Sequence, residues 1–130
     1  MTGTNDLPVT RRAGPRSSRQ AGARKVYDDY MGSPEWAARR RRWYGDERRA
    51  NEGLVHCGVC RRVCGRDSQL HHVAYDRLGS ELHEDLVALC KRCHHTVERY
   101  FAEMGWRTLG ARATMMRALI RRLQGKRVGA

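Results

Sequence analysis

The 130-residue sequence has few aromatic residues and no long hydrophobic run. Aromatic residues make up 7% of the chain, with a single phenylalanine, and hydrophobic residues of all kinds make up 40%. A chain of this length has room for one domain, and a core built from so little apolar material is small. No stretch approaches the roughly 20 apolar residues that span a bilayer, which excludes a membrane-spanning helix.

The first residues also lack the apolar segment of a secretory signal, because they read Met1-Thr-Gly-Thr-Asn-Asp-Leu-Pro. We therefore expect a cytoplasmic protein. Its five cysteines are an odd number, which argues against a framework of paired disulfides. In a reducing compartment, two cysteines separated by two residues are better interpreted as metal ligands.

Two such pairs occur, Cys57 with Cys60 and Cys90 with Cys93. Zinc prefers a tetrahedral set of thiolate and imidazole ligands, and two pairs supply four thiolates. The 29 residues between the pairs must then form a folded insert. A bound zinc ion would add a structural constraint that the small apolar core does not supply by itself. Cys64 could compete as a ligand, but we expect it to be a free buried thiol.

The net charge of +12 favours a polyanionic partner, and the charge gathers at the two ends of the chain. Residues 1–25 carry six basic residues against one acidic residue, and residues 101–130 carry seven against one. Residues 53–100 are nearly neutral, with seven basic and six acidic residues. Contact with nucleic-acid phosphate is therefore favoured over a merely solubilising surface, and a helix lying on a membrane surface is a minor alternative.

The chain divides into four segments. Residues 1–25 hold two of the three prolines and show no apolar periodicity, which predicts a disordered basic tail. Residues 26–52 are predicted to be a helical lead-in, residues 53–104 the core that contains the cysteine pairs, and residues 105–130 a basic C-terminal helix. In this last segment the helix is expected over residues 111–124, and packing of its apolar side on the domain is favoured over a dimer seam.

A helix is predicted to begin after Ser33, which caps its N-terminus, and to run to about Arg49. Trp36 and Trp43 lie seven residues apart and give it a narrow apolar face. The run Arg39, Arg40, Arg41 and Arg42 covers a full turn, so at least one of these arginines must lie near that face, with its stem buried and its charged head free. The others are expected to face nucleic-acid phosphates.

Between the cysteine pairs the pattern predicts a β-hairpin followed by a helix. A short strand is expected over residues 70–75, turn residues follow at 76–80, and a second apolar run covers residues 86–89. From about Lys91 the pattern becomes helical, with Val97 and Phe101 four residues apart. The sequence therefore predicts a small α+β fold with a ββα core held by four cysteines and flanked by helices.

Two adjacent histidines, His71 and His72, lie on the first predicted strand, so their side chains should point to opposite sides. Different roles follow from this. One imidazole can bind a divalent ion while its neighbour accepts a proton from water, as phosphodiester hydrolysis requires. On the following helix, His94 and Glu98 share one face and could approach the same ion as His71.

In these segments the chain resembles the HNH endonuclease family, in the branch whose ββα-metal core is held by a four-cysteine zinc site. The resemblance rests on Leu-His-His-Val at residues 70–73, on Gly-Ser-Glu-Leu-His-Glu-Asp-Leu at residues 79–86, and on Leu-Cys-Lys-Arg-Cys-His at residues 89–94. It extends upstream to residues 30–36 and the arginine-rich helix, and covers about residues 27–103.

The resemblance implies a role for each residue of the motif. His72 is the general base and the first histidine of the HNH motif, and His71 is the preceding metal ligand. His94 is the final histidine of the motif and a metal ligand. Asp85 occupies the middle position of the motif, where the family usually has an asparagine. In the family this residue helps to fix the loop that bears the base. Glu98 stands where family members often have another histidine; a carboxylate is a harder ligand and suits Mg²⁺ or Mn²⁺ better than zinc.

The implied function is metal-dependent cleavage of DNA, by nicking or double-strand cutting, that leaves 5′-phosphate and 3′-hydroxyl ends in a bacterial or phage-infected cell. Zinc would be structural, and Mg²⁺ or Mn²⁺ catalytic. His95 is the reserve ligand if Glu98 points away. One alternative is a non-catalytic zinc module that binds nucleic acid. Another is a protein-interaction module in a larger assembly, such as a phage DNA-packaging apparatus.

Overall fold

The computed structural model describes residues 18–129 of the chain, and the side chains of residues 22–126. In this part the chain is a small α+β fold, as predicted, and it has four α-helices and a two-stranded antiparallel sheet. The elements are α1 (Ser18–Met31), α2 (Pro34–Ala50), β1 (Gln69–His72), a 3₁₀ turn η1 (His83–Asp85), β2 (Leu86–Leu89), α3 (Lys91–Met104) and α4 (Leu109–Gly129). None of the helices in this part is both long and apolar enough to cross a membrane.

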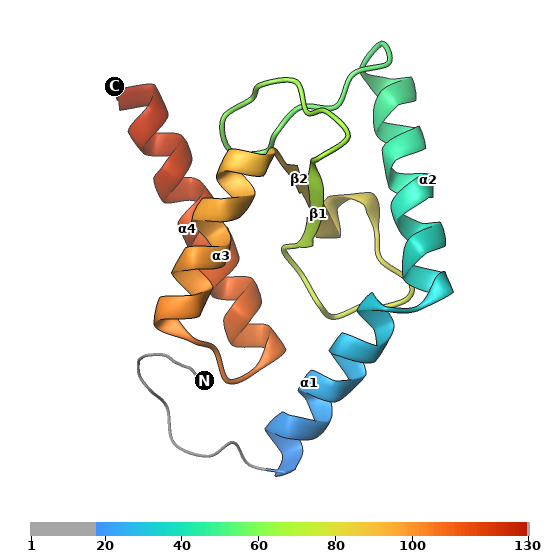
Figure 1. The fold of residues 1–130 in the computed structure, drawn as a ribbon, viewed down its shortest axis with the longest axis vertical. Coiled ribbons are helices and arrows are strands. Elements are labelled where there is room, and N and C mark those ends of the chain that lie inside the picture. The colour runs from blue at the N-terminus through green and yellow to red at the C-terminus, as the bar shows by residue number, and fades with distance from the viewer. Residues whose placement is uncertain (1–17, 130) are drawn as a thin grey trace.

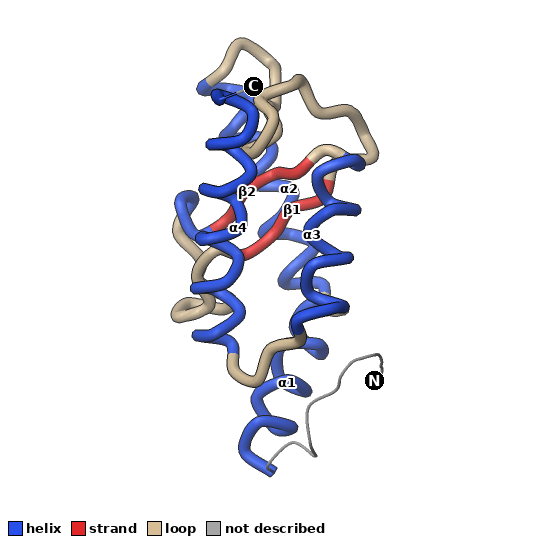
Figure 2. Tube along the Cα trace, turned by 90° about the vertical axis from the view of Figure 1, so that its left-hand side faces the viewer, coloured by secondary structure: helices blue, strands red, loops and turns tan. Residues whose placement is uncertain are grey.

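The β-hairpin lies between α2 on one side and the pair α3 and α4 on the other (Figure 1). The turned view in Figure 2 shows the two short strands surrounded by helices. Leu70 pairs with Ala88 and His72 with Leu86 in the antiparallel register, while His71 pairs with Val87 between them. Because side chains alternate along a strand, His71 and His72 belong to opposite faces of the hairpin.

One face of the hairpin packs against α2. Ser33 caps this helix by accepting a hydrogen bond from the Trp36 amide at 3.1 Å, as predicted from the sequence. Trp36 and Trp43 are both buried on the side of α2 that meets the strands. The cluster is completed by buried aliphatic residues, which are Val55, Leu70, Leu86 and Ala88.

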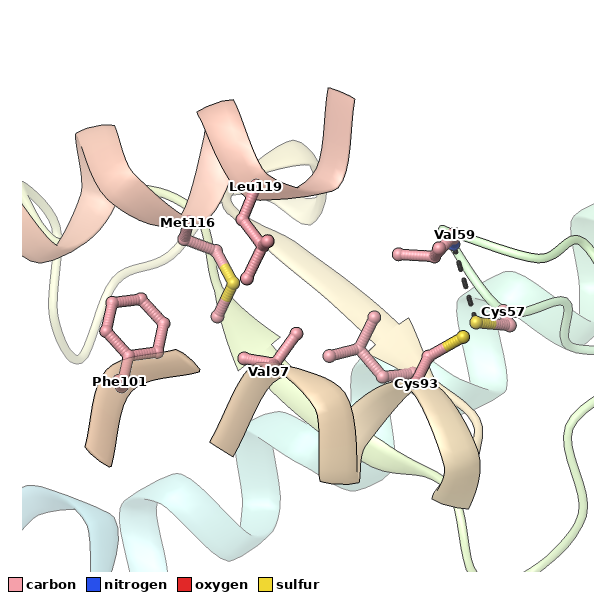
Figure 3. Packing of buried hydrophobic residues seen from close by; sticks show 8 residues of the cluster. Cys57, Val59, Cys93, Val97, Phe101, Met116 and Leu119 are labelled. Atoms are coloured by element: carbon pink, nitrogen blue, oxygen red, sulfur yellow. Dashed lines mark hydrogen bonds between the residues drawn. The ribbon is translucent and has the colours of Figure 1, made fainter. Parts of the chain in front are cut away.

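The other face of the hairpin packs against α3 and α4. Val97 and Phe101 of α3 meet Met116 and Leu119 of α4, and Cys93 at the start of α3 extends this cluster toward Cys57 (Figure 3). Burial of a side chain of this size contributes about 1.5–3 kcal/mol. The apolar side of α4 is therefore used within the domain, as expected.

The ends of three elements differ from the prediction. The tail predicted to be disordered over residues 1–25 is helical from Ser18, and residues 1–17 lie outside the described part. Alanine, arginine, glutamine and lysine favour a helix here even without an apolar period, and Tyr27 packs on Tyr75 with ring centroids 5.4 Å apart. The first strand ends at His72 instead of residue 75, and the last helix runs over residues 109–129 instead of 111–124.

Candidate metal centre and histidine site

Four cysteines from two distant segments meet at one end of the hairpin. The ligand atoms of Cys57, Cys60, Cys90 and Cys93 all lie within 4.8 Å of one another. A tight turn presents the first pair, since the Cys57 amide donates to the Arg62 carbonyl at 2.8 Å. The second pair spans the end of β2 and the first turn of α3. The predicted four-cysteine cluster is confirmed, and it is compatible with a zinc site.

The surroundings of the cysteines shift their pKa values in different directions. Burial alone would raise the pKa of the Cys57 thiol. Hydrogen bonds from the backbone amides of Cys60, Cys90 and Val59 together outweigh this effect, so the pKa is lowered to about 7. The Val59 amide lies 3.4 Å from its Sγ. Burial raises the pKa of Cys60 and of Cys93 instead. A set of four sulfur ligands suits zinc. Cys64 is outside the group, and burial raises its pKa to about 12.

Next to the thiol cluster, β1 and α3 bring two imidazoles together. The ring centroids of His71 and His94 lie 4.9 Å apart. Burial, followed by the charge of His94, lowers the pKa of His71 to about 3, so its ring is neutral at neutral pH. Glu98 Oε1 lies 3.8 Å from His94 Nε2, while His95 is exposed. In the described part of the chain the four cysteines are the only group of three or more such residues whose ligand atoms all lie within 4.8 Å of one another, so His71, His94 and Glu98 form a looser group.

His72 faces the opposite side of the hairpin, as the strand alternation predicts. Its side chain is buried, with 1% of the residue exposed, and its ring stacks on Trp36 at 4.7 Å and on Tyr75 at 5.2 Å between centroids. Its Nε2 lies 2.8 Å from Oε2 of Glu81. The ring is therefore closed off from solvent in this structure, which does not meet the exposure that activation of a water molecule requires.

Asp85 fixes the loop between the two strands. Its carboxylate accepts two hydrogen bonds from the Arg77 guanidinium, at 2.9 and 2.5 Å, and one from the Leu82 amide at 2.9 Å. The Arg77 hydrogen bond is the largest cause that holds the pKa of Asp85 below its ordinary value. Both acceptor oxygens are used, so an aspartate suits this loop better than the asparagine that the resemblance leads one to expect.

The arginine run of α2 divides between the core and the surface. Arg40, Arg41 and Arg42 are exposed. Arg39 is buried, with 5% of the residue exposed, and its Nε donates to the Glu81 carbonyl at 3.1 Å. The prediction of a buried stem with a free charged head is therefore wrong for Arg39, because its guanidinium is held inside the domain.

Two buried charged residues were not predicted from the sequence. Glu81 is buried beside His72, and Arg112 donates to the Tyr75 hydroxyl at 2.7 Å while lying over the Phe101 ring at 4.4 Å. The sequence gives no signal for either residue. Glu81 lies in a turn and Arg112 in a basic helix, where charged side chains are ordinarily exposed.

Comparison with protein-family models, with curated proteins and with solved structures found no match for this chain.

Proposed function

We propose that the protein is a metal-dependent endonuclease of the HNH type that hydrolyses DNA. The observation that carries this proposal is the pairing of His71 on β1 with His94 on α3, with ring centroids 4.9 Å apart. A hairpin followed by a helix supports both imidazoles, and the four-cysteine cluster lies at the start of the same helix. Asp85 at the entrance to β2 fixes the loop between the strands, which agrees with this assignment.

The two imidazoles and one carboxylate form a suitable ligand set for a divalent ion. His71 is neutral at neutral pH and so retains a free ring nitrogen for coordination. The side chains of His94 and Glu98 are 27% and 54% exposed, which leaves this group open to a substrate. A Mg²⁺ or Mn²⁺ ion bound by these residues would supply positive charge to a scissile phosphate.

His72 is the residue proposed to activate water, but its ring is buried and has to become accessible to water first. Trp36, Tyr75 and Tyr27 surround its ring, so this aromatic cover must open before water reaches it. Tyr27 belongs to α1, which precedes the hairpin and α2 in the chain. Movement of the Tyr27 side chain away from the ring, with Tyr30 still holding Glu81, is therefore part of the proposed reaction cycle.

The charge of the protein favours DNA as the substrate. The net charge is +12, and the exposed arginines of α2 give a basic surface beside the hairpin. Contacts of arginine with phosphate fix the position of a duplex without reading its sequence. We therefore propose weak sequence preference and binding that falls steeply with salt.

The proposal is tested with supercoiled plasmid DNA in the presence of Mg²⁺ or Mn²⁺. The wild-type protein is expected to nick the plasmid, and EDTA to stop the reaction. His94→Ala removes a proposed metal ligand and should reduce the cleavage rate by a factor on the order of 10² or more, since replacing residues that merely support such ligands already costs about 10–100-fold. The matched control is His95→Ala, because His95 is the exposed neighbour on the same helix. Equal rates for the two variants would contradict the metal site, provided that both retain zinc.

A second candidate function is that of a non-catalytic zinc module that binds nucleic acid. The burial of His72 favours this alternative, because a closed ring leaves the divalent-ion site without a base. It predicts binding to DNA or RNA with one tightly held zinc ion and no cleavage with either ion. In a larger nucleic-acid-processing assembly, cleavage would appear only after a partner protein is added.

A further inference from the structure

A buried carboxylate holds the ring of His72. Glu81 has 4% of its surface exposed, and it connects three elements of the fold. The Tyr30 hydroxyl of α1 donates to its Oε1 at 2.9 Å, and Nε2 of His72 on β1 lies 2.8 Å from its Oε2. Arg39 of α2 donates to its backbone carbonyl at 3.1 Å. Glu81 is therefore fixed from several sides, and so is the imidazole that it contacts.

The contact with Glu81 decides which nitrogen of His72 carries the proton. Burial raises the pKa of Glu81, but hydrogen bonds from His72, its own backbone amide and Tyr30 lower it below the ordinary value, so the group is a carboxylate. A carboxylate only accepts hydrogen bonds, and Nε2 must therefore be the donor. Nδ1 has no acceptor beside it in the described part of the chain, so a proton on that atom would be buried without a partner, whereas a proton on Nε2 is paired with the carboxylate.

The Nδ1 atom of His72 is buried and has no hydrogen-bond partner in the described part of the chain. A buried acceptor without a partner costs about 1–3 kcal/mol. A histidine that served packing alone would gain by pairing this atom, and native structures pair almost all such groups. An unpaired nitrogen opposite a fixed, carboxylate-bound one is the arrangement that a general base needs when its second nitrogen is held by an orienting group.

We propose that Glu81 is a positioning residue that fixes His72 in the tautomer protonated on Nε2, so that Nδ1 is the nitrogen that accepts a proton from water. This inference rests on the proposed endonuclease function. In the reaction, Nδ1 takes one proton from a water molecule whose oxygen bonds to phosphorus. The bond from phosphorus to the 3′ oxygen breaks, and that oxygen takes a proton from solvent. His72 then returns its proton to solvent.

The tautomer is measured directly in the wild-type zinc protein by long-range ¹H–¹⁵N correlation NMR of the histidine rings. The His72 signals are assigned from their absence in His72→Gln. The expected result is a protonated Nε2 and an unprotonated Nδ1. A proton on Nδ1, alone or together with Nε2, would overturn the inference, whatever the nuclease activity of the sample.

Cleavage rates then test the role of Glu81 in the reaction. Glu81→Gln keeps the size of the side chain, but its amide can donate as well as accept, so the tautomer is no longer enforced. We expect kcat to fall by a factor on the order of 10²–10⁴, with KM nearly unchanged and a second tautomer visible in the spectrum. The matched control is Glu84→Gln, an exposed acid in the following turn, which should leave kcat and the His72 signals unchanged.

The outcomes separate the two proposals. If the wild type cleaves DNA and folded, zinc-loaded Glu81→Gln cleaves equally fast, the role of Glu81 is refuted and the endonuclease function stands. If the wild type does not cleave under any condition, the endonuclease function is refuted, and the positioning role falls with it even where the Nε2 tautomer is observed. Should Glu81→Gln fail to fold, the wild-type tautomer still decides whether Nδ1 is the free nitrogen.

Discussion

The Sγ atoms of Cys60 and Cys90 lie 3.7 Å apart, although the whole β-hairpin separates these residues in the sequence. The proximity of these two cysteines closes a loop that contains His71, His72 and the turn fixed by Asp85. A metal ion across the four thiols would therefore hold both ends of the hairpin together. Because the apolar core is small, this closure is expected to contribute a large part of the folding free energy.

Removal of zinc is predicted to unfold the protein. Structural zinc sites contribute on the order of 10 kcal/mol of apparent folding free energy, so a strong chelator should abolish cooperative thermal unfolding. Cys90→Ser should lose zinc and show the same loss. Cys64→Ser is the matched control and should retain one zinc ion per chain. Metal analysis together with circular dichroism measures both effects, and loss of zinc from Cys64→Ser but not from Cys90→Ser would contradict the assignment of ligands.

Gly58 is predicted to be intolerant of a side chain, because a Cβ atom there would overlap Cγ2 of Val87. The backbone is held at this point, since the Gly58 amide donates to the Ala88 carbonyl at 2.8 Å. Gly58→Ala is expected to lower the free energy of unfolding by about 1–3 kcal/mol, and Val87→Ala in the same chain should recover part of that loss.

The control is Gly45→Ala in the middle of α2. A Cβ atom there meets only the end of the Arg49 side chain, so this change should stabilise the protein by about 0.5–1 kcal/mol. Additive effects of the Gly58 and Val87 changes in urea unfolding would show that the two residues do not interact.

The local patterns of the sequence were enough to predict much of this fold. The Ser33 cap, the two cysteine pairs and the ββα order each depend on residues close together in the chain, and the structure agrees with them. Which arginine of α2 is buried could not be predicted. Residues 39 and 40 both lie three or four positions from Trp36 and Trp43, so the helical period does not choose between them.

The surroundings of His72 could not be predicted either. Strand alternation predicts that His71 and His72 face apart, but not which of them lies under α1 and α2. That depends on Tyr30, Arg39 and Glu81, which come from three separate segments and meet only in the folded chain. A single acid in a turn carries no local signal of burial, because its partners determine whether burial is tolerated.

Asp85→Asn is predicted to destabilise the protein in a pH-dependent way. The folded-state pKa of Asp85 lies below its ordinary value of 3.8, so its ionised form stabilises the fold above that pH. The stabilisation is lost as the pH falls from 3.8 through the lowered pKa. Since Arg77 is 44% exposed, we expect a loss on the order of 1–2 kcal/mol at neutral pH.

The measurement for Asp85 is urea unfolding of the wild type and Asp85→Asn at stepped pH values. The difference between them should be constant above about pH 5 and shrink below it. The comparison is restricted to pH values at which both proteins retain zinc, because loss of zinc is itself expected to unfold them. Asp76→Asn, an exposed acid in the same loop, is the control and should change stability by no more than about 0.5 kcal/mol. A difference that grows as the pH falls would show that the carboxylate destabilises the fold.

The exposed arginines of α2 are predicted to bind DNA through its phosphates, whereas their buried neighbour is not. Replacing Arg40, Arg41 and Arg42 by glutamine should weaken binding to unrelated duplexes by similar factors. It should also reduce the slope of log Kd against log salt by up to about one unit for each arginine that contacts a phosphate.

Arg39→Met is the matched control from the same run. It should leave the slope unchanged but lower the free energy of unfolding by about 1–3 kcal/mol, since its guanidinium donates to the Glu81 carbonyl. Fluorescence anisotropy over a range of salt concentrations measures the slope. If the triple variant keeps the wild-type slope, DNA contacts a different surface, and the basic helix α4 is the next one to test, because Arg117, Arg121 and Arg122 are exposed there.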